Sequence, residues 1–198
     1  DDVLAEVVAP LRQSSSLVLR APPGAGKTTR VPPALLAGGL EIPGKIVVLQ
    51  PRRVAARATA ARIAFEQGWR LGEEVGYQVR FESRTGPRTR IEILTEGILL
   101  RRLLDDPFLP DTSVVVFDEF HERSLQADLG LALTLDVRRQ LRPQLRLLVM
   151  SATLDGAAVS RLLDEAPLIS APGLSFPVET RYAERDSTDY LDRQVAAA

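Results

Sequence analysis

The sequence predicts an α/β fold in which helices cover both faces of a mostly parallel central sheet. Three observations support this: strand and helix patterns alternate along almost the whole chain, two strand patterns are continuously apolar, and 45% of the 198 residues are hydrophobic. The apolar runs lie at 46–49 and 147–150. Strands that helices shield on both faces show such runs, so a three-layer arrangement is expected. A chain of this length can bury the full core of one domain.

The expected elements follow one another as alternating helices and strands. Helical periodicity is present at 3–12, 27–38, 53–67, 96–105, 124–140 and 155–164. Strand patterns are present at 16–20, 45–50, 75–80, 90–94, 113–117 and 145–150. Pro32 and Pro33 fall near the first turns of a helix, so they are expected to kink or shorten it rather than abolish it. The polar segment 83–90 is expected to be a loop.

The composition changes near residue 171, where prolines and a glycine precede an extended pattern at 178–182. We therefore expect residues 1–170 to form the main domain and residues 171–198 to form an exit strand, a linker and the beginning of a further element. The chain does not begin with methionine. We expect it to be a segment of a longer protein.

Charge and composition exclude several classes of protein. The net charge of -1 argues against a strongly basic nucleic-acid coat, although a local groove lined by arginines remains compatible with it. The absence of cysteine excludes disulfides and cysteine-bound metals. No apolar run approaches 18 residues and no signal-type N-terminus is present, so a soluble, cytoplasmic protein without a membrane partner is expected.

A glycine-rich segment with the sequence Ala-Pro-Pro-Gly-Ala-Gly-Lys-Thr-Thr occupies residues 21–29 and follows the apolar run 17–19. The order strand, glycine loop, helix is typical of a phosphate-binding loop. The strict pattern has glycine six residues before the lysine, where this chain has Ala21. The alternative is a glycine turn that caps a helix, but such a turn does not require a Lys-Thr pair at the helix N-terminus.

Each residue type in the loop has a chemical reason to be there. Gly24 and Gly26 permit positive φ angles and a close approach of the backbone to phosphates, and Thr28 offers a hydroxyl to Mg²⁺. Lys27 supplies a compact positive charge. Lysine is rare in this chain, because 23 of the 25 basic residues are arginine and the only other lysine is Lys45.

The acidic box Asp-Glu-Phe-His, residues 118–121, directly follows the apolar strand pattern 113–117. Strand ends carry the chemistry of many α/β proteins, and an Asp-Glu pair suits metal binding beside general-base catalysis. The alternative is a surface turn after a core strand. His121 is the only histidine, and without another His or Cys it cannot complete a zinc site.

The loop and the box together predict nucleoside triphosphate hydrolysis. A carboxylate at the end of a neighbouring strand can hold Mg²⁺ between the β and γ phosphates, while an adjacent carboxylate orients the attacking water. We assign the first role to Asp118 and the second to Glu119. A GTPase would need an Asn-Lys-x-Asp motif, which is absent. A nucleotide-switched nucleic-acid binding module without motor activity is the alternative, but it would be expected to lose the base.

Six ordered motifs resemble those of the DEAH-box helicases of superfamily 2. They are the glycine loop at 21–29, Gln-Pro-Arg-Arg-Val at 50–54, Gly-Tyr-Gln-Val-Arg-Phe-Glu at 76–82, Thr-Glu-Gly at 95–97, Asp-Glu-Phe-His-Glu-Arg-Ser at 118–124 and Ser-Ala-Thr at 151–153. Phe120 points to the bacterial HrpB-like branch, although nothing in the pattern explains its aromatic ring. The resemblance covers residues 14 to about 182.

The resemblance implies a P-loop NTPase fold of the RecA-like kind, in which this chain is the first of two RecA-like lobes of an ATP-dependent helicase. Residues 171–198 would then lead into the truncated start of the second lobe, which supplies arginine fingers. Loss of such fingers costs about 10³- to 10⁵-fold in turnover in comparable sites. The chain alone is therefore expected to bind nucleotide weakly and hydrolyse it slowly.

The resemblance also implies roles for individual residues, with ATP and Mg²⁺ as cofactors. The residues expected to bind the nucleotide are Gly24, Ala25, Gly26, Lys27, Thr28, Thr29 and, stacked on adenine, Arg62. Those expected to act in catalysis are Lys27, Asp118, Glu119 as base, and His121, with Thr28 and Asp118 holding Mg²⁺. Those expected to grip or sense nucleic acid, RNA in preference to DNA, are Arg52, Arg53, Thr95, Gly97, Ser151 and Thr153.

Several of these residues have a structural alternative. Arg52 and Arg53 could be solvated charges at the start of a helix, although the helix dipole disfavours cations there. Thr95 could cap the helix at 96–105, and the Ser-Ala-Thr motif could also be a cap. Arg62 could belong to a salt-bridged helix face.

Overall fold

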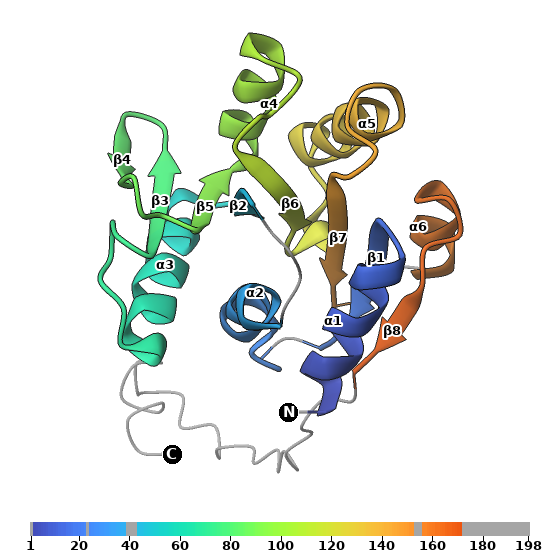
Figure 1. Ribbon diagram of the computed structural model, residues 1–198, viewed down its shortest axis with the longest axis horizontal. Helices are drawn as coiled ribbons and strands as arrows, with labels where there is room; N and C mark the ends of the chain where they lie inside the picture. The colour runs from blue at the N-terminus through green and yellow to red at the C-terminus, as the bar shows by residue number, and fades with distance from the viewer. Residues whose placement is uncertain (1, 23, 39–42, 153–155, 172–198) are drawn as a thin grey trace, which may run out of the picture.

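The computed structural model describes residues 2–22, 24–38, 43–152 and 156–171 (Figure 1). Its helices are α1 (Asp2–Gln13), α2 (Lys27–Ala37), α3 (Arg53–Gln67), α4 (Glu96–Asp105), the 3-10 helix η1 (Phe120–Glu122), α5 (Leu125–Gln140) and α6 (Gly156–Leu162). Its strands are β1 (Ser16–Arg20), β2 (Lys45–Gln50), β3 (Val75–Val79), β4 (Glu82–Arg84), β5 (Ile91–Thr95), β6 (Thr112–Phe117), β7 (Arg146–Ser151) and β8 (Leu168–Ser170).

These strands form a single sheet in the order β4-β3-β5-β2-β6-β7-β1-β8, and every neighbouring pair except β3 and β4 is parallel. Helices α1, α2 and α3 lie on one side of the sheet, and α4, α5 and α6 lie on the other (Figure 1). The chain moves along the sheet in one direction through α2 and α3 and in the opposite direction through α4 and α5, as right-handed crossovers require. The predicted three-layer α/β fold with a mostly parallel sheet is confirmed.

The alternation of side chains along each strand fills both layers. In β2, Val48 belongs to the apolar cluster under α1, α2 and α3, while Val47 and Leu49 belong to the cluster under α4, α5 and α6. Both sides of this strand are therefore apolar, which explains its continuous hydrophobic run. Each fully buried side chain of this size stabilises the fold by about 1.5–3 kcal/mol.

Helix α2 continues through both of its prolines to Ala37. Pro32 and Pro33 each lack an N–H donor, but their rings are buried together with Val31 and Leu35. Packing of this face against the sheet therefore outweighs the two missing backbone hydrogen bonds, and the prolines do not end the helix.

Two strands were not expected from the sequence. β4 falls at the start of the segment predicted as a loop, and it is held by antiparallel pairing with β3 across a turn in which Phe81 has a φ of 66°. β8 pairs in parallel with β1. Each has only three residues, which is too short for an alternating pattern to appear. The extended segment predicted at 178–182 lies outside the described residues.

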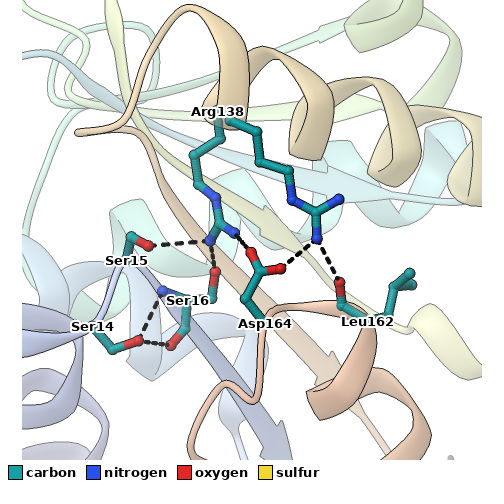
Figure 2. A network of polar contacts seen from close by, with 7 residues as sticks. Ser14, Ser15, Ser16, Arg138, Leu162 and Asp164 are labelled. Carbon is teal, nitrogen blue, oxygen red and sulfur yellow. Dashed lines mark hydrogen bonds and ion pairs between the residues drawn. The ribbon is translucent and has the colours of Figure 1, made fainter.

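Arg138, in the last turn of α5, joins three parts of the chain that are distant in sequence (Figure 2). Its guanidinium donates hydrogen bonds to the hydroxyls of Ser15 and Ser16 at the beginning of β1, and it forms an ion pair with Asp164 after α6. Arg139 pairs with the same carboxylate. The Arg138 side chain is only 5% exposed, and this burial lowers its pKa. The Asp164 carboxylate and the two serine hydroxyls therefore stabilise its positive charge.

We expect Asp164→Asn to lower the free energy of unfolding by roughly 1–2 kcal/mol at pH 7, because it leaves the buried Arg138 without its counter-charge. Hydrogen bonding to Arg139 lowers the pKa of Asp164 below the ordinary 3.8, so the carboxylate contributes stability above that pH and loses it as the pH falls through the lowered pKa. The difference should therefore shrink in acid. Urea unfolding at several pH values measures it.

Asp105→Asn is the matched control, because Asp105 pairs with Arg101 at 3.8 Å on the exposed surface of α4. Its effect should stay within about 0.5 kcal/mol. Equal effects of the two substitutions would show that Arg138 does not depend on Asp164.

Candidate functional site

The carboxyl ends of the parallel strands bring the sequence motifs to one edge of the sheet. The glycine loop follows β1, the acidic box follows β6, and Gln50, Thr95 and Ser151 are the last residues of β2, β5 and β7. We expected the strand before the acidic box to be a neighbour of β1, but this was wrong, because β7 lies between β6 and β1. The loop and the box nevertheless touch, since side chains from both reach across the end of β7.

The glycine loop has the backbone that a phosphate site needs. Gly24 and Gly26 have φ angles of 78° and 72°, and Gly26 is the N-cap of α2. A Cβ on Gly24 would meet nothing within 4 Å, so the positive φ rather than crowding is the constraint there. The Ala21 N–H donates to the carbonyl of Ser151 at 3.0 Å, which attaches the start of the loop to β7.

Lys27 is buried at the first position of α2, and its Nζ lies 3.0 Å from Oε1 of Glu119. Glu119 has a φ of 50°, in the left-handed region that residues other than Gly, Asn and Asp rarely adopt. Strained backbone of this kind is concentrated at functional sites. In this conformation the Glu119 carboxylate reaches Lys27 of the glycine loop.

Asp118 is 4% exposed and its carboxylate accepts three hydrogen bonds. Oδ2 accepts from Oγ1 of Thr28 at 2.5 Å and from Nε2 of Gln50 at 2.6 Å. Oδ1 accepts from the backbone N–H of Glu119 at 2.8 Å. Burial raises the pKa of Asp118 in spite of these donors, because removal from water disfavours the charged form.

This donor set suits Mg²⁺. The Thr28 hydroxyl donates its hydrogen bond to Asp118, so the lone pairs of its oxygen can bind a cation. Within the described part of the chain, no group of three or more His, Cys, Asp or Glu side chains could enclose a metal ion. Mg²⁺ in phosphoryl-transfer sites uses one or two carboxylates together with substrate phosphates, so one carboxylate and one hydroxyl fit that mode of binding.

His121, the last residue of the acidic box, contacts the chain just after the end of β7. Its Nδ1 accepts the backbone N–H of Ala152 at 3.3 Å, and its Nε2 lies 3.4 Å from Oε2 of Glu119. Since Nδ1 uses its lone pair as an acceptor, the proton of the neutral ring is on Nε2 and faces Glu119. The structure thus connects the Ser-Ala-Thr motif to Glu119. Thr153, the last residue of that motif, lies outside the described residues.

A cleft of about 400 Å³ opens beside the glycine loop. It is lined by Thr28, Thr29, Glu119 and, from α3, Thr59 and Arg62.

Arg62 has a partner within its own helix as well as a place in this cleft. Its Nε donates to Oε1 of Glu66 at 2.6 Å, so the salt-bridged helix face considered above is present. The hydrogen bond from Arg62 lowers the pKa of Glu66. Both interpretations of Arg62 are compatible with this position.

The expected nucleic-acid residues lie along the same edge but do not form one cluster. Arg52 forms an ion pair with Glu122 at 2.8 Å, whereas Arg53 donates to the carbonyl of Arg80 at 3.1 Å. Thr95 occupies the N-cap position of α4, yet its side chain makes no capping hydrogen bond. Its hydroxyl is therefore not committed to the helix end.

Sequence patterns indicated no role for two residues that shape the site, although both lie within the motifs at 50–54 and 118–124. Gln50 is a buried polar residue at the end of an apolar strand. Ser124 caps α5 by accepting the N–H of Ala127 at 2.9 Å and also donates to Glu96.

Phe120 is buried in the core cluster under α5, edge-to-face with Phe117 at a centroid distance of 6.1 Å. This packing supplies the reason for an aromatic residue inside the acidic box. The ring anchors η1, which directly follows the two carboxylates in sequence, to the core.

Residues 2–162 match the model of a family described as DEAD/DEAH box helicase. The ATP-dependent RNA helicase HrpB of Escherichia coli K12 is 48% identical over 196 residues, which are 99% of this chain and 24% of that protein. The chain thus spans about a quarter of the length of this relative.

Two solved structures confirm the RecA-like fold. The structure described as E. coli DEAH/RHA helicase HrpB has a TM-score of 0.86 at 47% identity and covers 99% of this chain and 25% of its own. A second, described as E. coli DExH-box NTPase HrpB, has a TM-score of 0.83 at 47% identity and covers 99% and 24%. The resemblance to the HrpB-like branch is confirmed as well. None of the helices that the structure describes combines the length and apolar character needed to cross a membrane.

We expect Asp118→Asn to raise the thermal stability of the metal-free protein at pH 7.5, because it removes a buried charge. The pKa of Asp118 in the folded state is raised above the ordinary 3.8. Between these two pKa values the folded state binds more protons than the unfolded state, so the free energy of unfolding falls as the pH rises. The gain in the variant should therefore disappear as the pH is lowered. Scanning calorimetry with chelator present measures it, and destabilisation at pH 7.5 would contradict the account.

Proposed function

The chain belongs to the DEAD/DEAH box helicase family, and on that basis we propose that it is the nucleotide-binding lobe of an ATP-dependent RNA helicase that couples ATP hydrolysis to translocation or unwinding. The observation that carries this proposal is the contact between loop and box: Thr28 donates to Asp118 while Lys27 pairs with Glu119. A fold hosts many activities, so these side chains, rather than the fold, indicate the function. The choice of RNA rests on the name of the HrpB relative.

The nucleotide phosphates bind at the N-terminus of α2, where backbone N–H groups and the helix dipole favour anions. Thr28 and Asp118 would hold Mg²⁺, and a bound Mg²⁺ would supply positive charge next to the phosphates. Arg62 lines the cleft in a position to stack on adenine, exchanging its contact with Glu66 for the base.

Glu119 acts as the general base that orients and deprotonates the attacking water. Because Glu119 is paired with Lys27, it can act as the base only after this ion pair opens. A γ-phosphate that reaches Lys27 competes with the Glu119 carboxylate for the same ammonium, so binding of the substrate releases the base. Glu119 then keeps the Nε2–H group of His121 as its partner. Because Nδ1 of the same ring accepts from Ala152, His121 links the position of Glu119 to the end of β7.

Nucleic acid binds along the same edge through Arg52, Arg53, Thr95 and Gly97, which contact the phosphate backbone without sequence preference. The second RecA-like lobe, which we place in the rest of the full-length protein, supplies arginine fingers. The 198-residue chain alone should therefore hydrolyse ATP slowly.

We expect Glu119→Gln in the full-length protein to reduce RNA-stimulated ATP hydrolysis by about 10²- to 10⁴-fold, the usual contribution of a general base. ATP binding should be retained or tightened, since the substitution removes the carboxylate that competes for Lys27. Phosphate release and equilibrium binding measure the two effects separately.

Glu73→Gln is the control, because Glu73 pairs with Arg88 far from the loop. It should hydrolyse ATP like the wild type. Unchanged turnover in Glu119→Gln would favour the nucleotide-switched binding module and remove the role given to Glu119.

Gly97→Ala should separate nucleic-acid binding from stability. Gly97 is the second residue of α4, and a Cβ there meets nothing within 4 Å. Alanine reduces the conformational freedom of the unfolded chain, so the substitution should stabilise the folded protein by roughly 0.4–1 kcal/mol. The added methyl group stands where the nucleic-acid backbone approaches. We expect RNA binding, measured by fluorescence anisotropy, to weaken by about 1 kcal/mol, or roughly fivefold.

The matched control is Gly130→Ala in α5, where a Cβ would make ordinary contacts of 3.7 Å or longer inside the molecule. It should leave RNA affinity unchanged. If Gly97→Ala binds RNA as tightly as the control, Gly97 does not lie against the nucleic acid.

A further inference from the structure

Gln50 makes a contact that the helicase assignment does not explain. It is the last residue of β2 and is 3% exposed, and its Nε2 donates to Oδ2 of Asp118 at 2.6 Å. The backbone fixes the two residues relative to each other, because β2 and β6 are paired and the Asp118 N–H donates to the carbonyl of Leu49 at 3.3 Å. The side-chain contact is therefore built between two adjacent strand ends.

The chemistry of the pair sets the direction of this hydrogen bond. An ionised carboxylate only accepts, so the Gln50 amide must present its NH₂ group. Of the two donors to Oδ2, the Thr28 hydroxyl is also the group that would ligate Mg²⁺. Gln50 is the other donor, and it would not bind the metal. It can therefore keep the Asp118 carboxylate oriented both before and after Mg²⁺ binds.

The position of Gln50 in the chain connects this contact to the expected nucleic-acid edge. Pro51 follows it and lacks the N–H that would continue the strand, and Arg52 then reaches Glu122. Two residues of the segment 50–52 thus contact the segment 118–122, Gln50 at Asp118 and Arg52 at Glu122.

We propose that Gln50 is a positioning residue that holds the Asp118 carboxylate in the orientation in which it serves Mg²⁺, and so sets the Mg²⁺ requirement of the enzyme. The inference rests on the proposed function, since it assumes a Mg²⁺-dependent nucleotide site at Asp118. Partners that orient metal-binding carboxylates typically contribute about 10- to 100-fold to metal affinity.

The test is Gln50→Met in the full-length protein, which keeps the volume and unbranched shape of the side chain but removes the donor. ATP hydrolysis is measured against free Mg²⁺, and ATP binding is measured separately with chelator present. We expect the Mg²⁺ concentration for half-maximal turnover to rise about tenfold or more. Turnover at saturating Mg²⁺ should largely recover, and ATP binding without metal should be unchanged.

A purely structural role for Gln50 would give a different pattern, in which binding without metal and turnover at saturating Mg²⁺ fall together. That pattern, or an unchanged Mg²⁺ requirement, would overturn the proposal. If wild-type protein hydrolyses ATP without any dependence on Mg²⁺, the proposed function itself fails, and this outcome is visible before any variant is made.

Two further variants complete the design. Gln78→Leu removes another strand glutamine, one that accepts from Arg102 away from the site, and it should leave the Mg²⁺ requirement unchanged. Gln50→Asn keeps the amide on a side chain that is shorter by one methylene group. It should also raise the required Mg²⁺ concentration, but by less than Gln50→Met does. It serves as the decisive variant if Gln50→Met fails to fold, and an Mg²⁺ requirement equal to wild type would then reject the proposal.

Discussion

At the carboxyl edge of the sheet, the buried Asp118 carboxylate accepts hydrogen bonds from the glycine loop through Thr28, from β2 through Gln50 and from the backbone of Glu119. Burial of this charge disfavours its ionised form, as the raised pKa shows. The three donors therefore have to converge on it, and their convergence fixes the loop, β2 and the acidic box relative to one another. At the opposite edge, Arg138 ties α5 to the beginning of β1 and to Asp164. That network stabilises the fold in a place where it constrains no chemistry.

The segment from Asp118 to Ser124 extends this convergence to the glycine loop and to the motifs at 50–54, 95–97 and 151–153. Glu119 pairs with Lys27, His121 accepts from Ala152, and Glu122 pairs with Arg52. Ser124 reaches Glu96 in the Thr-Glu-Gly motif. Contacts on the glycine loop and on the expected nucleic-acid edge thus meet within seven consecutive residues, anchored to the core by Phe120. A continuous set of contacts of this kind is what coupling between two binding events requires.

The sequence was sufficient for the parts of the molecule in which chemistry or burial dictates residue types. A phosphate loop needs glycines, a lysine and a hydroxyl, and strands covered on both faces need continuous apolar runs, so the glycine loop and the parallel sheet were predictable. β4 and β8 were not, because three residues cannot show a period and their existence depends on pairing with β3 and β1. The position of β7 between β1 and β6 depends on topology, which local patterns do not encode.

Individual side chains show the same division. The ring of Phe120 has its partner Phe117 in the core, and Gln50 has its partner on another strand, so only the tertiary structure reveals what either residue does. Thr95 occupies the cap position that its residue type suggests, but its hydroxyl does not cap. Residue type predicted where Thr95 lies, whereas the use of its hydroxyl depends on partners that propensity does not specify.

The central claim is that the glycine loop and Asp118 form one Mg²⁺-nucleotide site. Calorimetric titration of ATP into the protein, with Mg²⁺ and then with chelator, tests it most directly when repeated on Asp118→Ala. The account predicts that Mg²⁺ strengthens ATP binding to the wild type and that this gain disappears in Asp118→Ala, while the weaker metal-free binding persists in both. An equal gain from Mg²⁺ in the two proteins would show that Asp118 does not hold the metal and would contradict the account.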